Sequence, residues 1–365
     1  HTYQKPTMAP KNDVQLDSQS LRRAMSSEEL PETIEERRLL SVGGTTGIGA
    51  ELANDDDAEL VPVIDLSQPT EVAEEQLWEA ANRVGFFTVV NHGIPQTVID
   101  DMFDQSIQFF DQPLSSKKEQ CPFDRALNSG FEHKEQMRPS CGLADQKESY
   151  HVSPRKGAMD SRWPTTPETF RDVAEKSMIP EAHKLSLHIM RMLERRGCKH
   201  LKPGTLEKAH TLWEEDSRCC LRVINYLPMT IHELKDNTQP GNRHWRAAPH
   251  TDFSCLTLLF QRVGEEGLEC RANPRSAVGA DTDTKWLPVK PIEGGIAVNI
   301  GDMLSHWSDG ALFSNLHRVR MPRDEVECSK SRYSIGYFTQ ADSSYIIESK
   351  NGDTITAGEY IKKRL

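Results

Sequence analysis

A histidine and an aspartate stand two residues apart at the head of an apolar run, in the stretch PHTDFSCLTLLFQ from Pro249 to Gln261. In an extended chain, alternate side chains leave on the same face, so His250 and Asp252 can converge on one point while Thr251 turns away. An imidazole and a carboxylate placed in this way form half of a metal site. A second histidine must come from elsewhere in the chain.

His317 is the best candidate for that second histidine. Its segment, SNLHRVRMP, is typical of a short strand bounded by turn residues. Two imidazoles and one carboxylate on one side of Fe(II) leave three coordination positions open for a co-substrate and dioxygen. A hydrolytic zinc site is the alternative that the same ligand types leave open.

The stretch RYSIGYF, which follows His317, holds a candidate receptor for an organic acid. Arg332 and Ser334 share a strand face, and a guanidinium fork beside a hydroxyl is well suited to a carboxylate. Each motif alone has an ordinary structural interpretation, and the one HxE pair, at His133 and Glu135, lies in a polar stretch and is interpreted as solvated. The conjunction of the motifs favours a metal centre with an acid anchor.

Three motifs, HTD, NLHRV and RYSIGYF, occur in an order that resembles the 2-oxoglutarate and iron(II)-dependent dioxygenases, specifically the group related to isopenicillin N synthase. The likeness covers roughly residues 60 to 345. Four further segments contribute to it: VPVIDLS from Val61, GFFTVVNHGIP from Gly85, FFDQPLSSKK from Phe109 and VNIGDML from Val298.

The resemblance implies Fe(II) held by His250, Asp252 and His317, with 2-oxoglutarate as co-substrate, its far carboxylate paired with Arg332 and Ser334. Dioxygen would be the oxidant and ascorbate a stimulant. Succinate and carbon dioxide would leave while a small organic substrate is hydroxylated, desaturated or cyclised. Related halogenases replace the metal-binding carboxylate by a small residue, so the presence of Asp252 argues against halogenation.

One position departs from the family pattern. Many members carry a tyrosine immediately before the proline of the strand that precedes the HxD, and its hydroxyl helps to hold the co-substrate. Here the sequence LRVINYLP places Leu227 there. Tyr226 then lies on the opposite strand face unless the strand bulges, and Asn225 is the geometrically better replacement. Both are candidate 2-oxoglutarate-binding residues.

The resemblance also suggests where the substrate is contacted. Substrate-facing loops of the family fall between about Phe123 and Ser161, which makes Tyr150 and Arg138 candidate contacts. Phe338 and Gln340 follow the Arg-x-Ser strand, where related enzymes often line the substrate pocket. Arg222 and Arg246 are interpreted as structural ion-pair residues. His306 could compete with His317, but the family has no ligand at its position.

Two rival functions stay open. An oxidase of the isopenicillin N synthase kind binds its substrate directly to iron without 2-oxoglutarate, and it retains the same Arg-x-Ser pair. A non-catalytic jelly-roll binding protein would keep the metal for stability alone. Oxygen consumption without succinate would indicate the first, and loss of fold on chelation without oxygen chemistry would indicate the second.

The second half of the chain consists of short apolar segments separated by turns, which indicates a closed or sandwiched antiparallel sheet. The resemblance sharpens this to a mixed α and β fold with a double-stranded β-helix (jelly roll, cupin-like) core flanked by N-terminal helices. The expected strands of this half are Cys219–Leu227, Cys255–Phe260, Leu268–Cys270, Trp286–Val289, Ile296–Ile300, Leu304–Trp307, His317–Met321 and Tyr333–Thr339.

The first half is expected to be mainly helical, with strands near Val61–Leu66, Gly85–Val90 and Glu148–Val152. We divide the chain into an acidic N-terminal extension (1–58, partly disordered or loosely packed), a helical region (59–215), the β-helix core (216–345) and a tail with a short helix (346–365). Apolar periodicity predicts helices within the extension and the helical region, at Ser26–Leu40, Glu71–Arg83, 95–112, Pro167–Lys176 and Pro180–Arg196.

Composition narrows the class of partner. Of the 365 residues, 36% are hydrophobic and 27% charged, and the net charge of −11 argues against a nucleic-acid partner. No apolar run of about 18 residues is present, so no membrane span is expected. The eight cysteines form no CxxC pair and indicate a reducing compartment. We expect a cytoplasmic monomer or weak homodimer acting on a small molecule.

Overall fold

The computed structural model describes residues 30–34, 36, 61–136, 143–238, 244–272 and 286–364. The expected contact at Arg138 and most of the N-terminal extension lie outside these residues. The strands are β1 Val63–Asp65, β2 Phe86–Val90, β3 Gly130–His133, β4 Glu148–Val152, β5 Cys220–Tyr226, β6 Ala247–His250, β7 Leu256–Gln261, β8 Leu268–Arg271, β9 Trp286–Pro288, β10 Gly295–Ile300, β11 His317–Val319, β12 Arg332–Thr339, β13 Ile346–Glu348 and β14 Thr354–Thr356.

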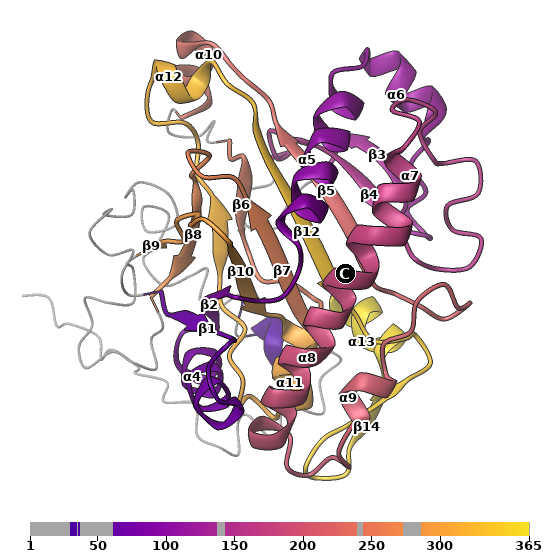
Figure 1. Cartoon of the computed structure of the whole chain (residues 1–365), viewed down its shortest axis with the longest axis vertical. Coiled ribbons are helices and arrows are strands. Elements are labelled where there is room, and N and C mark those ends of the chain that lie inside the picture. Colours follow the sequence, from indigo (N-terminus) through magenta and orange to yellow (C-terminus); the bar gives the residue numbers. More distant parts are fainter. Residues whose placement is uncertain are drawn as a thin grey trace, which may run out of the picture.

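The helices precede, flank and follow these strands (Figure 1). They are α4 Thr70–Arg83, α5 Gln96–Phe110, α6 Leu114–Gln120, α7 Phe170–Asp172, the π-helical turn η2 Val173–Met178, α8 Ile179–Gly197, α9 Thr205–Lys208, α10 Ile231–Asn237, α11 Asp302–Trp307, α12 Glu325–Cys328 and α13 Ala357–Arg364. The helix expected at the end of the chain is therefore present. The two helices expected before Gly197 form one continuous helical stretch through η2.

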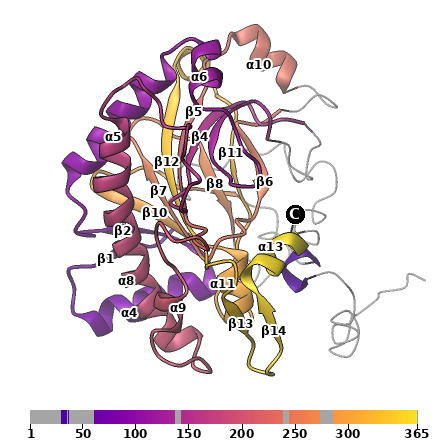
Figure 2. The same ribbon diagram turned by 90° about the vertical axis from the view of Figure 1, so that its right-hand side faces the viewer.

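Two sheets make up the core. The larger has the strand order β1-β2-β10-β7-β12-β5-β4-β3, and the smaller has the order β6-β11-β8-β9. All pairs in them are antiparallel except β1 with β2. Figure 2 shows α5 and α8 on one side of the large sheet and the small sheet on the other. This arrangement is the double-stranded β-helix that the resemblance implied.

Side chains of β12 alternate between the two faces of the large sheet, as a period of two requires. Tyr333, Ile335 and Tyr337 enter the apolar core that the sheet forms with the helices. Arg332, Ser334 and Phe338 therefore point toward the small sheet. On β5 the same rule places Leu221 and Val223 in the helix-side core, and Ile224 and Tyr226 between the two sheets.

The segment from Leu304 to Trp307 was expected to be a strand. It is instead part of the helix α11. Met303, Leu304 and Trp307 are buried at helical spacing, which a short apolar run does not distinguish from a strand. Strands β3 and β6 were not predicted. The sequence of β6, AAPH, consists of small residues and a proline, which are depleted in strands.

Close packing at the end of α8 explains the glycine at position 197. The expected helix ended at Arg196, and Gly197 is the last residue of α8. A Cβ at this position would lie 3.1 Å from Leu312 Cγ and 3.3 Å from Trp78 Cζ3. The glycine therefore permits the close approach of these two side chains to the helix.

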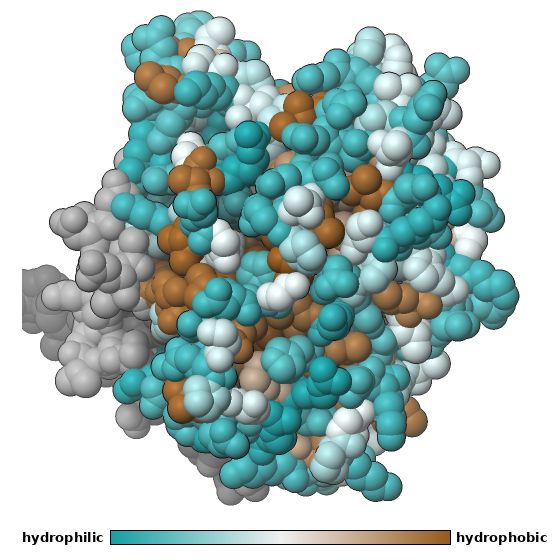
Figure 3. Space-filling model, in the orientation of Figure 1, coloured by the Kyte–Doolittle hydropathy of each residue, from teal (hydrophilic) through white to brown (hydrophobic). Residues whose placement is uncertain are grey.

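Hydrophilic side chains predominate on the face drawn in Figure 3, and apolar ones gather in separate patches. Large apolar side chains that are exposed are distributed along the described chain, for example Val63, Val263 and Ile346. Within the described ranges, the structure contains no helix with the length and apolar character needed to cross a bilayer.

Candidate metal centre and acid pocket

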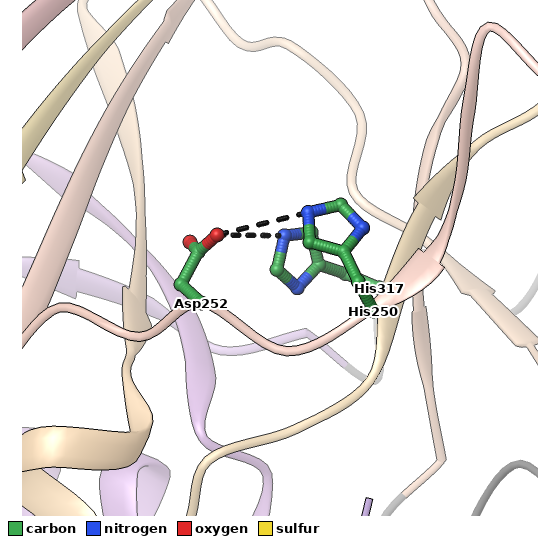
Figure 4. A group of neighbouring side chains, drawn as sticks. All are labelled: His250, Asp252 and His317. Atoms are coloured by element: carbon green, nitrogen blue, oxygen red, sulfur yellow. Dashed lines mark ion pairs between the residues drawn. The ribbon is translucent and has the colours of Figure 1, made fainter. Parts of the chain in front are cut away.

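His250, Asp252 and His317 lie together between the two sheets (Figure 4). His250 ends β6, His317 begins β11, and these two residues are register partners in the small sheet. One potential ligand atom from each of the three residues lies within 4.8 Å of the others. Asp252 Oδ1 is 3.7 Å from His250 Nε2 and 3.6 Å from His317 Nε2. The three residues selected by sequence thus surround one point.

Backbone carbonyls orient both imidazole rings. His250 Nδ1 lies 2.6 Å from the carbonyl oxygen of Ala248, and His317 Nδ1 lies 3.3 Å from that of Asn315. Because a carbonyl can only accept a hydrogen bond, each Nδ1 carries the proton and each Nε2 presents a lone pair toward Asp252. This tautomer is the one that a metal ligand requires.

The aspartate is oriented in the same way by two side chains of the large sheet. Thr257 Oγ1 donates to Asp252 Oδ2 at 2.7 Å, and Asn299 Nδ2 donates to the same oxygen at 2.9 Å. Both donors are buried. Oδ1 is consequently the oxygen that faces the histidines. Two imidazole nitrogens and one carboxylate oxygen form a donor set that fits Fe(II).

Arg332 and Ser334 contribute polar atoms to the space between the sheets. Arg332 donates from Nε to the carbonyl oxygen of Glu265 and from Nη2 to Gln261 Oε1, both at 2.9 Å. Arg332 Nη1 and Ser334 Oγ are buried and have no hydrogen-bond partner among the described residues. Buried polar atoms without partners are costly. A bound carboxylate would satisfy both atoms, so the pair fits the far end of 2-oxoglutarate.

Comparison with known proteins agrees with this geometry. Residues 61–171 match the family described as the N-terminal region of non-haem dioxygenases in morphine synthesis, and residues 218–341 match the 2OG-Fe(II) oxygenase superfamily. A UPF0676 protein of Schizosaccharomyces pombe is 32% identical over 320 residues, which cover 84% of this chain and 91% of the relative. The chain belongs to the 2OG-Fe(II) oxygenase superfamily.

Other relatives of this oxygenase carry more specific names. The 2-oxoglutarate-dependent dioxygenase tropC of Talaromyces stipitatus is 25% identical over 84% of this chain and 95% of its own length. The structure of Neurospora crassa T7H in complex with alpha-KG superposes with a TM-score of 0.70, at 24% identity, over 86% of this chain and 98% of T7H. The protein is therefore an oxidoreductase that uses Fe(II) and 2-oxoglutarate.

Tyr226, and not Asn225, lies beside Arg332. Tyr226 and Arg332 are register partners, and the guanidinium carbon is 4.9 Å from the centroid of the tyrosine ring. Asn225 faces the helices, where its amide donates to Glu148 Oε1 at 3.0 Å. The expectation that Asn225 would replace the missing tyrosine is therefore wrong. Alternation was counted from Leu227, which lies beyond the end of β5.

Tyr150, a candidate substrate contact, lies in the helix-side core. Its side chain is fully buried in the helix-side core against Phe109 and Phe170, and its hydroxyl donates to the carbonyl oxygen of Arg162 at 2.7 Å. Strand β4 was predicted correctly, but the face on which Tyr150 lies depends on the pairing of β4 with β5. Sequence alone does not give that pairing.

Phe338 lies on the face of β12 that it shares with Arg332 and Ser334. Its register partner on β7 is Thr257, the residue that binds Asp252. The guanidinium of Arg222 lies 4.9 Å from the centroid of the Phe338 ring. Phe338 is thus near the metal centre. Gln340 follows the end of β12 and is half-buried.

The rival histidine lies elsewhere. His306, on α11, has its Nδ1 3.1 Å from Glu32 Oε1, and its ring lies against Tyr360. Within the part of the chain that the structure describes, the only group of histidine, cysteine and acidic side chains arranged to hold a metal is that of His250, Asp252 and His317.

No sequence motif marks the contact between α13 and the turn that carries Asp252. Arg364 Nη2 donates to Asp302 Oδ2 at 2.5 Å and to Thr251 Oγ1 at 3.1 Å. Asp302 in turn donates from its backbone nitrogen to the carbonyl oxygen of Asp252 at 2.7 Å. Burial raises the pKa of Asp302 to about 7, and the charge of Arg364 opposes this rise. Figure 2 shows α13 next to α11.

Thr257→Val should weaken Fe(II) binding about 10- to 100-fold, because valine keeps the volume of threonine but removes one of the two donors that orient Asp252. The measurement is an anaerobic Fe(II) titration. Thr339→Val is the matched control, since Thr339 is buried on β12 and its hydroxyl has no partner among the described residues. Equal Fe(II) affinity of the two variants would contradict the role of Thr257.

Arg364→Met should lower the free energy of unfolding by about 3 kcal/mol, because it leaves the buried Asp302 carboxyl without its cation. Fe(II) affinity should fall with it, since Asp302 supports the turn that carries Asp252. Lys363→Met, at an exposed neighbouring position, should change neither quantity. Denaturant unfolding and Fe(II) titration measure both effects, and an unchanged R364M protein would exclude the contact.

Proposed function

We propose that this oxygenase oxidises a small organic molecule at an unactivated carbon, by hydroxylation, desaturation or oxidative cyclisation, in specialised metabolism. His250, Asp252 and His317 hold Fe(II), and Arg332, Ser334 and Tyr226 hold the far carboxylate of 2-oxoglutarate. The proposal rests on one observation: His250 Nε2, Asp252 Oδ1 and His317 Nε2 lie around one point between the sheets.

Each residue has a defined task in this proposal. The carbonyl oxygens of Ala248 and Asn315 hold the imidazoles in the ligating tautomer, and Thr257 and Asn299 hold the carboxylate. Bound Fe(II) and 2-oxoglutarate supply the activation of dioxygen, with succinate and carbon dioxide as co-products. Enclosure between two sheets excludes bulk water from the reacting groups. Phe338 and Gln340 are proposed to contact the substrate.

Names of relatives support a small-molecule substrate. JOX2, at 25% identity and a TM-score of 0.65 over 83% of this chain and 84% of its own, was solved with 2OG, Fe and JA. The relatives tropC and ucsF are fungal 2-oxoglutarate-dependent dioxygenases. We propose that the substrate of this oxygenase is comparable in size to the JA of the JOX2 complex.

The test is release of succinate when the protein, Fe(II), ascorbate and 2-oxoglutarate are mixed under air with a panel of small organic molecules. We expect a basal release that one class of compound accelerates. Oxygen consumption without succinate would instead indicate an oxidase that makes no use of 2-oxoglutarate. Loss of fold on chelation, without either reaction, would indicate a metal-stabilised binding protein.

We further propose that the chain acts in the cytoplasm, as a monomer or weak homodimer, without nucleic acid. The seven cysteines that the structure describes are buried free thiols, which supports a reducing compartment. The net charge of −11 is unfavourable for binding phosphate backbones. Light scattering after size-exclusion chromatography tests the oligomeric state.

A further inference from the structure

Arg246 is a buried cation with no counter-ion in the part of the chain that the structure describes. It immediately precedes β6, its side chain is only 3% exposed, and it forms no ion pair with a carboxylate in the described ranges. Its Nε and Nη2 atoms are buried and have no hydrogen-bond partner there. Arg246 was expected to be a structural ion-pair residue, but the described residues offer it no such pair.

Other buried arginines of this oxygenase behave differently. Arg318 Nε lies 2.6 Å from Glu269 Oε2, and the Arg364 guanidinium is paired with Asp302. Arg320 forms a two-pronged pair with Glu327, at 2.6 and 3.0 Å. The charge of Glu327 raises the pKa of Arg246, but the pair with Arg320 already engages this carboxylate. Among the described residues, Arg246 therefore differs from Arg318, Arg320 and Arg364 in lacking a carboxylate partner, a property that it shares with Arg332.

The position of Arg246 places it beside the acid pocket. Ala247, the next residue, is the register partner of Val319 on β11. A Cβ built on Gly267 would lie 3.5 Å from Val319 Cγ1 and 3.8 Å from Arg332 Nε, so Arg332 lies against this part of the small sheet. Burial, and then the positive charge of Arg332, lower the pKa of Arg246 to about 10.

Four buried polar atoms of Arg332, Ser334 and Arg246 have no partner among the described residues: Arg332 Nη1, Ser334 Oγ, Arg246 Nε and Arg246 Nη2. A buried guanidinium is stable only when an anion and hydrogen-bond acceptors compensate its lost hydration. Two such cations with only neutral acceptors leave an excess of positive charge. A dicarboxylate supplies the missing charge and up to four acceptor sites at its far end.

We propose that Arg246 is a second co-substrate-binding arginine, which holds the far carboxylate of 2-oxoglutarate together with Arg332 and Ser334. This inference rests on the proposed function, because it takes the pocket beside Arg332 as the 2-oxoglutarate site. The inference also predicts whether replacing Arg246 raises or lowers the stability of the ligand-free protein. A structural arginine stabilises the protein, whereas a cation that awaits a ligand destabilises the ligand-free protein.

The test compares the wild type with Arg246→Met, which keeps much of the side-chain length and removes the charge. Mn(II) replaces Fe(II) as a redox-inactive metal, and calorimetry measures binding of 2-oxoglutarate and of 2-oxovalerate, which has the same chain length but lacks the far carboxylate. We expect R246M to weaken 2-oxoglutarate binding about 10- to 100-fold and to leave 2-oxovalerate binding unchanged. Unfolding of the ligand-free variant should require at least as much denaturant as the wild type.

Two further variants keep the test decisive. Arg246→Lys retains the charge without the planar fork, so its 2-oxoglutarate affinity should lie between those of the wild type and R246M. This variant also provides the comparison with the wild type if R246M folds poorly. Arg318→Met removes an arginine that has a carboxylate partner and should unfold more easily than the wild type. The role of Arg246 would be overturned if R246M and R246K preferred 2-oxoglutarate over 2-oxovalerate as strongly as the wild type does. It would also be overturned if the variants bound both acids more weakly by the same factor. A wild type that does not discriminate would instead contradict the proposed 2-oxoglutarate site.

Discussion

His317→Ala should reduce Fe(II) affinity by well over 100-fold and abolish succinate release. The substitution removes one of three protein ligands, and loss of a group that merely orients a ligand already costs about 10- to 100-fold. His317 also fixes the centre geometrically, because it is the register partner of His250 and shares Asp252 Oδ1 with it. Anaerobic Fe(II) titration and a succinate assay measure the two effects.

His306→Ala is the matched control for this prediction. His306 lies on α11, which follows β10, and it was the alternative to His317 as a predicted metal ligand. Its ring contacts Glu32 and Tyr360 instead. Its removal should leave Fe(II) affinity within about a factor of two of the wild type, since His306 contacts no metal ligand. The partly exposed contact of His306 with Glu32 contributes little to stability. A reversal of the two results would exclude His317 as a ligand.

Arg332→Met should raise the dissociation constant for 2-oxoglutarate about 100-fold or more. Removing one partner of a buried, hydrogen-bonded charge pair costs about 2 to 5 kcal/mol, because the carboxylate is left desolvated without its fork. Fe(II) affinity should not change, since Arg332 donates to Glu265 and Gln261 and not to a metal ligand. The measurement is calorimetric titration of the Mn(II) protein with 2-oxoglutarate.

Lys330→Met provides the comparison for Arg332→Met. Lys330 is a cation two residues earlier, on the exposed approach to β12. Its loss should leave 2-oxoglutarate affinity unchanged, which separates a specific pairing from a general effect of net charge. An R332M protein that binds 2-oxoglutarate as tightly as K330M would show that the acid is held elsewhere.

The metal centre was accessible to sequence reasoning because its geometry is local. Residues two apart share a strand face whatever the surrounding fold, so Arg332 and Ser334 could be paired before any sheet was known. The same rule paired His250 with Asp252, although Asp252 lies in the turn that follows β6. The strands β5, β7, β10 and β12 were equally visible, since buried strands rich in β-branched and aromatic residues carry a strong signal.

What failed depended on long-range pairing. Asn225 lies on the face opposite to the expected one, and Tyr150, a candidate substrate contact, lies in the helix-side core, because the inward face of a strand is decided by its neighbours in the sheet. Arg246 and Arg364 carry no motif, and their roles arise from contacts between segments distant in the chain. Although Leu227 stands at the position of the family tyrosine, Tyr226 lies beside Arg332 from within β5.

A crystal grown without oxygen, in the presence of Fe(II) and 2-oxoglutarate, tests the central claim most directly. Anomalous scattering at the iron edge should give one peak bonded to His250 Nε2, Asp252 Oδ1 and His317 Nε2. The far carboxylate of 2-oxoglutarate should lie against Arg332 and Ser334. Iron at any other position, or the acid bound away from Arg332, would contradict the account.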